Sequence, residues 1–213
     1  MGLDMRPLSK PKAGKEQRFY ELYSLIPSEN LSPDQREQLL EEWFALGIPS
    51  YETIKAPQVG RDAQADAWLR EQYDADDNPD KPPFDEVYQD YQGYYVIELA
   101  PEQDSVPVYR AFGQDANVFR GQFLADCQDL ISEDLLNEAW SNHLAEEAVD
   151  YAQRLLAAVT PIAQQHGLEY LKDQYEPPEA EPESLESQLH IVYSLARWLI
   201  FYGSRGHGYE ADF

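Results

Sequence analysis

The chain has one cysteine, few histidines and no long hydrophobic run. Because Cys127 is the single cysteine, an internal disulfide is excluded, which is compatible with a reducing compartment. The longest apolar stretch, residues 191–202, is interrupted by Ser194 and Arg197 and falls short of the ~20 residues of a membrane span. The N-terminal residues lack the apolar core of a signal peptide, so we expect a soluble, cytoplasmic protein.

Positive charge is scarce as well. The chain carries 16 Lys and Arg residues against 40 Asp and Glu residues, a formal net charge of −24. Residues 1–18 hold five basic and two acidic residues, and the rest of the chain holds 11 and 38, so a +3 segment precedes a −27 body. Such a body repels nucleic-acid phosphates and anionic lipid, and it attracts cations or a basic protein. We therefore expect neither nucleic acid nor membrane as a partner. An adaptation for solubility alone would give the same excess of acidic residues.

Recognised catalytic motifs are also lacking. No G-x-S-x-G or other nucleophile context occurs in the sequence. The glycines of residues 203–208 follow a predicted helix instead of joining a strand to a helix, so neither phosphate-loop template applies. Cys127 lies on an apolar helical stripe beside Asp126 and Asp129, whose charges would raise the pKa of its thiol. We expect no cofactor, and the sequence favours a protein that is not an enzyme.

What the sequence does contain is enough apolar surface for a core, with 43% hydrophobic and 13% aromatic residues. Its periodicity predicts a mostly helical α+β protein. Helices are predicted from Ser32 to Gly47, from Asp62 through Tyr73, from Ala116 to Ile131, from Ser132 to Gly167, and from Ser184 to Tyr202. The aromatic and β-branched runs 94–99 and 106–112, separated by a polar turn, predict a small antiparallel hairpin.

Composition divides the chain into a single domain, residues 19–202, and two terminal segments. Residues 1–18 combine proline, glycine and basic residues and predict a flexible arm or an edge segment, and residues 203–213 predict a glycine-rich tail. Within the domain, the acidic segments 74–83 and 175–183 read as linkers.

The last predicted helix is apolar nearly all the way round. Its polar residues fall in one narrow stripe: Glu186, His190, Ser194 and Arg197. Such a helix is either central in the fold or covered by a partner. The second reading predicts a homo-oligomer that buries residues 185–202.

Two pairs of histidine and glutamate could hold a metal ion. His143 and Glu147 are one helical turn apart, as are Glu186 and His190. Two facing helices could bring the pairs together, although the spacing matches neither HExxH nor the Glu-x-x-His of di-iron bundles. A solvated, salt-bridged helix face explains the first pair without a metal ion. A metal-dependent enzyme or metal-binding protein is therefore an alternative function.

A cluster of tyrosines and carboxylates suggests protein recognition instead. It comprises Asp85, Glu86, Tyr88, Asp90, Tyr91 and Tyr94. Tyrosine offers a rigid contact surface with a polar tip, and neighbouring carboxylates can meet Lys or Arg of a basic partner. The same tyrosines could instead pack in the core. The leading hypothesis is a non-catalytic protein-binding module, inhibitor-like or immunity-like, for a basic partner.

Overall fold

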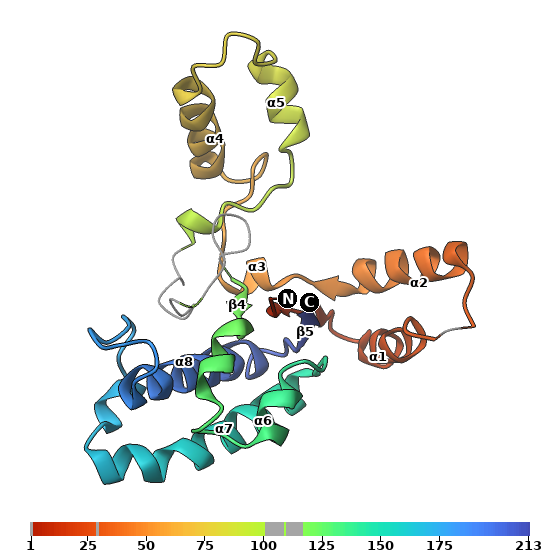
Figure 1. Ribbon diagram of the computed structural model, residues 1–213. Coiled ribbons are helices and arrows are strands. Elements are labelled where there is room, and N and C mark those ends of the chain that lie inside the picture. The colour runs from red at the N-terminus through yellow and green to blue at the C-terminus, as the bar shows by residue number, and fades with distance from the viewer. Residues whose placement is uncertain (1, 29, 101–108, 110–116) are drawn as a thin grey trace.

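A computed structural model describes residues 2–28, 30–100, 109 and 117–213. Helices pack around a small antiparallel sheet, and two helix pairs, α1–α2 and α4–α5, extend away from this body (Figure 1). The predicted α+β class is therefore confirmed. The helices, with 3-10 helices marked η, are α1 (Glu16–Leu25), α2 (Pro33–Leu46), α3 (Ser50–Thr53), α4 (Ala63–Ala75), α5 (Phe84–Asp90), η1 (Ile97–Leu99), η4 (Gly121–Cys127), α6 (Glu133–Glu138), α7 (Ala145–His166), η5 (Glu169–Lys172) and α8 (Leu185–Gly203). The strands are β1 (Asp4–Pro7), β2 (Lys10–Pro11), β3 (Gly47–Ile48), β4 (Phe119–Arg120) and β5 (Tyr209–Asp212).

The N-terminal segment belongs to the sheet. Strand β1 lies between β4 and β5 and pairs antiparallel with both, so that Asp4 is opposite both Arg120 and Asp212. Leu3 and Met5 alternate into the core and are fully buried. Residues 4–7 and 10–11 of the predicted arm are therefore paired strands.

The predicted C-terminal tail is also part of the sheet. Tyr209 in β5 is fully buried, and its backbone exchanges two hydrogen bonds with the backbone of His143, at 2.8 and 2.9 Å. Gly208 lies so close to this segment that a β-carbon would sit 2.0 Å from the carbonyl oxygen of His143. The glycine that suggested mobility is required by this close approach.

The sheet is not where the sequence predicted it. Instead of a strand at 94–99, Tyr95 forms an isolated bridge with Gln58 and the 3-10 helix η1 follows. The consecutive residues Val96 and Ile97 are both buried, so the alternation of a half-buried strand fails there. The second predicted strand, 106–112, lies outside the described residues except for Tyr109.

Helices α2, α4 and α8 form close to their predicted bounds, and the signals for α2 and α8 are local. Ser32 and Gln35 make a capping box that starts α2, and Gly47 follows its last residue. Helix α8 begins after the predicted cap Ser184 and is buried along most of its length by its own chain. It is central in the fold, which accounts for its apolar faces.

The long helix predicted from Ser132 is two helices. Helix α6 ends at Glu138, and α7 begins at Ala145, where the Glu147 carboxylate accepts a hydrogen bond from the Leu144 N–H. The segment predicted as helical from Ala116 contains β4 and the 3-10 helix η4 instead. The spacing of the aromatic residues did not distinguish an α-helix from this short strand and 3-10 helix.

Helices α7 and α8 run antiparallel at the centre of the body. A β-carbon at Gly203, the end of α8, would touch Val149 and the carbonyl of Ala145 at the start of α7. Nearer the middle of α8, Tyr193 lies close to Thr160 of α7. The two helices share one hydrophobic core with the sheet.

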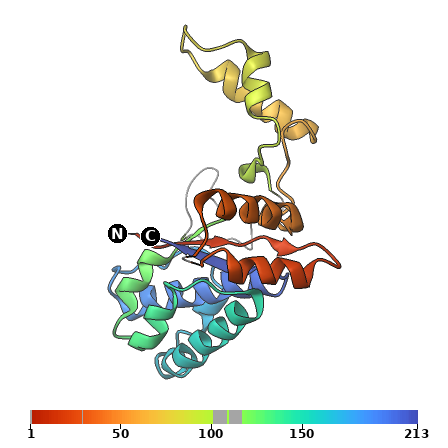
Figure 2. The same cartoon turned by 90° about the vertical axis from the view of Figure 1, so that its right-hand side faces the viewer.

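Helices α4 and α5, with the loop between them, form a module that projects from the body (Figure 2). The chain enters and leaves through a paired stalk, in which Val59 N–H donates to the Tyr94 carbonyl and Val96 N–H to the Pro57 carbonyl. The predicted acidic linker supplies the loop, which the ammonium of Lys81 ties to the carbonyls of Tyr73 and Asp76 at 2.6 Å each. The module has its own small core: Val59, Ala65, Leu69 and Val96.

Candidate functional site

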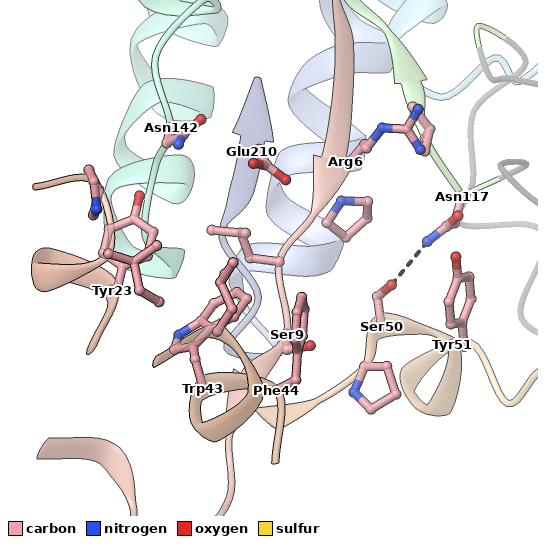
Figure 3. A pocket seen from close by; sticks show the side chains of 17 residues that line it. Arg6, Ser9, Tyr23, Trp43, Phe44, Ser50, Tyr51, Asn117, Asn142 and Glu210 are labelled. Carbon is pink, nitrogen blue, oxygen red and sulfur yellow. Dashed lines mark hydrogen bonds between the residues drawn. The ribbon is translucent and has the colours of Figure 1, made fainter. Parts of the chain in front are cut away.

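A groove of about 470 Å³ runs between the α1–α2 pair and the sheet. We call it the aromatic groove, because Tyr23, Trp43, Phe44 and Tyr51 line it (Figure 3). Its volume falls in the range typical of ligand pockets, which are mostly apolar with a few polar groups. Here those groups come from distant parts of the chain: Arg6, Ser9, Ser50, Asn117, Asn142 and Glu210.

The aromatic side of the groove is built by α1 and α2. Trp43 stacks on Phe19 with ring centroids 5.0 Å apart and is only 7% exposed. The next residue, Phe44, points away from that small core and is 61% exposed. Because successive helical residues diverge by about 100°, one ring anchors the helix pair and the other is left on the surface.

Two buried polar atoms on residues that line the groove have no hydrogen-bond partner within the described structure, Trp43 Nε1 and Asn117 Oδ1. Asn117 is 2% exposed and held in place, since its Nδ2 donates to Ser50 Oγ at 3.0 Å and its backbone carbonyl accepts from Trp198 Nε1. An unsatisfied buried polar atom costs about 1–3 kcal/mol. Beside the groove, therefore, the chain leaves the hydrogen-bonding capacity of two buried polar atoms unused.

An acidic hollow of about 510 Å³ adjoins the groove and shares Asn142 with it. The hollow is lined by Glu138, Asn142, His143, Glu146, Glu147, Asp150 and Arg154. Arg154 bonds to Glu138 and Asp150. Among the described residues, Glu146 and Glu147 have no basic partner, so their negative charge is open to solvent.

Tyr23 lines the aromatic groove and is influenced by carboxylates of both depressions. Burial raises the pKa of its phenol, and the negative charges of Glu147 and Glu210 raise it further. Glu147 lines the acidic hollow and Glu210 the aromatic groove. The phenol of Tyr23 therefore experiences negative charge from both depressions.

The four predicted metal ligands do not come together. Because His190 is thirteen residues before Gly203 on α8, and Gly203 touches the start of α7, the two histidines are separated by roughly 20 Å along α8. Both nitrogens of His143 face oxygens, those of Ser141 and Glu138. Both nitrogens of His190 are also engaged, by the Tyr109 hydroxyl and the Gln174 carbonyl.

The glutamates of these pairs are occupied too. Glu147 accepts from the Leu144 N–H and Glu186 from the Tyr170 hydroxyl. Within the part of the chain that the structure describes, no three His, Cys, Asp or Glu side chains gather into a metal-holding group. The polar face of α7 is the salt-bridged face that the sequence offered as the other explanation.

The predicted tyrosine and acid cluster lies on and after α5, in the projecting module. Its carboxylates, Asp85, Glu86 and Asp90, are exposed. Tyr88 and Tyr94 are half-buried against the module core, and Tyr94 stacks on Trp68 with ring centroids 6.1 Å apart. Tyr91 remains 37% exposed and packs edge-on against Tyr94. The cluster therefore divides between core and surface.

No protein-family model matches the chain, and neither a curated protein nor a solved structure does. Among the described residues, no helix is both long and apolar enough to cross a membrane.

The sequence prediction missed the groove. Its parts come from β1, α1, α2, β5 and the segments around Ser50 and Asn117, which no local pattern relates to one another. Trp43 and Phe44 are adjacent on α2, and one apolar helical stripe can hold two adjacent residues, so the sequence pattern did not show that Phe44 would be exposed.

Proposed function

We propose that the chain is a non-catalytic binding protein for a basic partner protein. A segment of that partner lies in the aromatic groove, and its lysine or arginine side chains reach into the acidic hollow. The observation that carries the proposal is that the two depressions adjoin and share Asn142. An apolar surface joined to unpaired carboxylates fits a segment that is both apolar and cationic.

The chemistry of the two depressions supports this assignment. Aromatic side chains are enriched among the residues that dominate interface energies, and Phe44 is exposed at the groove. Opposite charges increase the rate of association and help to select the partner. Since the chain has a net charge of −24, a basic segment is favoured over an acidic one throughout its approach.

The other functions suggested by the sequence have less support. Each of the histidines proposed as metal ligands uses both ring nitrogens within the fold. The apolar faces of α8, which motivated a homo-oligomer, are covered by the chain itself.

Selection from a random peptide library displayed on phage tests the proposal. We expect peptides that bind the wild-type protein to be enriched in Lys or Arg next to aromatic or branched aliphatic residues. Phe44→Ser should reduce their affinity at least tenfold, and so should the double variant Glu146→Gln/Glu147→Gln. Enrichment without a basic bias would contradict the proposal.

Two matched variants serve as controls. Phe213→Ser removes another exposed phenylalanine, which is 66% exposed and lies outside the groove. Asp85→Asn/Glu86→Gln removes two exposed carboxylates on α5. If the α5 variant loses binding while the groove variants keep it, the recognition surface is the projecting module and the groove assignment is wrong.

A further inference from the structure

A third cavity, of about 340 Å³, lies between α7, α8 and the segment after η5. Its walls include Lys172, Arg197 and Arg205, against one carboxylate, Asp173. In a chain with 16 basic and 40 acidic residues, three basic side chains at one cavity are a concentration of positive charge. We call it the arginine cavity.

The arginines of this cavity are not used for ion pairs. Of the nine described arginines, six pair with a carboxylate: Arg6, Arg18, Arg61, Arg70, Arg120 and Arg154. Arg36 donates instead to the carbonyls of Ile26 and Ser28. The other two arginines without a described carboxylate partner, Arg197 and Arg205, both line the cavity.

Aromatic stacking holds these two guanidinium groups in place. Arg197 lies 4.3 Å from the ring centroid of Tyr175, and Arg205 lies 3.9 Å from that of Phe201. Backbone carbonyls fix one edge of each group, since Arg197 Nη2 donates to the Lys172 carbonyl and Arg205 Nη1 to the Phe201 carbonyl. Stacking covers the face of a guanidinium and leaves its remaining N–H groups for an oxyanion.

One hydrogen-bond donor of Arg197 also lacks an acceptor in the described structure. Its Nη1 is buried and has no hydrogen-bond partner in the described structure. A charged donor without a partner is costly at a partly buried site, and a carboxylate or phosphate oxygen is the acceptor that suits a guanidinium fork.

We propose that the arginine cavity binds a small organic molecule that carries a carboxylate or phosphate group. The oxyanion is held by Arg197 and Arg205, and the apolar part of the molecule packs on Tyr193 and Phe201. The cavity size suits a small molecule. The charge of the whole chain disfavours a polyanion such as nucleic acid.

Titration with three fluorinated probes, followed by 19F NMR line broadening, tests this site. The probes are 4-fluorobenzoate, 4-fluorophenyl phosphate and the neutral analogue 4-fluorobenzamide. We expect one of the two anions to bind at least tenfold more tightly than the amide, and the preferred anion identifies the oxyanion as carboxylate or phosphate. Equal binding of all three probes, or no binding, would overturn the proposal.

Arginine variants locate the binding. Arg205→Gln changes an exposed side chain and should weaken the preferred anion at least fivefold, and adding Arg197→Gln should abolish its preference over the amide. Arg36→Gln, which also removes an arginine bonded to backbone carbonyls, is the matched control and should leave binding unchanged. If Arg197→Gln prevents folding, judged by circular dichroism, Arg205→Gln alone decides. Retained affinity in that variant assigns the anion to another place and overturns the site.

Discussion

The Thr53 hydroxyl lies 2.6 Å from Nε2 of His207. The other ring nitrogen of His207, Nδ1, is 2.8 Å from the Leu8 carbonyl, which can only accept, so Nδ1 carries the proton and Nε2 accepts from Thr53. Three segments that are far apart in the sequence thus meet at one fully buried, neutral imidazole. Burial lowers the pKa of His207 to about 4, and the charge of Lys10 adds to this effect, whereas the Leu8 carbonyl opposes it.

This depressed pKa makes stability depend on pH between about 4 and 6.5. In that range the unfolded chain binds a proton that the native chain does not, so stability falls as the pH is lowered. The shift predicts a loss of about 3 kcal/mol from pH 7 to 4, since one pKa unit is worth about 1.4 kcal/mol. Urea denaturation at half-unit pH steps measures it.

His207→Gln should flatten much of that pH dependence. Some will remain, because burial also lowers the pKa of His190. His166→Gln, at the exposed end of α7, removes a histidine outside this buried site and is the matched control. An equal slope in wild type and His207→Gln would show that other groups cause the acid sensitivity.

Gly208→Ala should be strongly destabilising. The new β-carbon would meet backbone atoms, His143 O at 2.0 Å and Leu144 Cα at 2.9 Å, which cannot move aside as a flexible side chain can. We expect a loss of about 3 kcal/mol or more in the free energy of unfolding. Gly167→Ala is the control: it has open space and a φ of +68°, so it should cost about 1 kcal/mol. Similar losses in both variants would contradict the close approach.

Cys127 should be inert in the folded protein. It is fully buried, and burial together with the charge of Asp126 raises the pKa of its thiol to about 12. Ellman's reagent at pH 8 should therefore react with one thiol per chain in guanidinium chloride and with almost none in buffer. Asp126→Asn should remain protected, because burial is the larger cause. Rapid labelling of the native wild type would contradict this packing.

Leu69→Ala should loosen the projecting module and leave the body folded. Leu69 belongs to the small core of the module, and truncating a buried leucine costs about 2–5 kcal/mol. Hydrogen exchange should show faster exchange over residues 63–90 and unchanged protection in α8. Leu195→Ala, in the central helix, is the comparison and should lower protection throughout. Equal losses in α8 from both variants would mean that module and body unfold together.

Helix boundaries encoded by adjacent residues could be predicted from the sequence. Ser32, Pro33 and Gln35 start α2 by contacts within one turn. The β1–β5 pairing, in contrast, joins Asp4 to Asp212, and each strand has only four residues. Such short segments carry no alternation long enough to distinguish a strand from an arm or a tail.

The candidate site was out of reach for the same physical reason. The hydrogen bond from Asn117 to Ser50 and the closeness of Glu210 and Glu147 to Tyr23 depend on how distant segments pack. A helical wheel places Glu147 and His143 together on one face. It does not predict the break at residues 139–144, which turns His143 toward Glu138. The net charge could be read from the sequence, whereas the positions of unpaired charges could not.

The paired stalk makes the α4–α5 module separable by protein engineering. Gln58 and Tyr95 face each other across an antiparallel bridge, so the chain leaves the body and returns to it at points about 5 Å apart. A two-residue turn is enough to span that gap, and residues 59–94 can be excised or exchanged for another hairpin-like insert without stretching the remaining chain. The body would then serve as a scaffold with one defined grafting position, at which Tyr95 is kept because its ring stacks on Tyr51 of the aromatic groove, 5.0 Å between centroids.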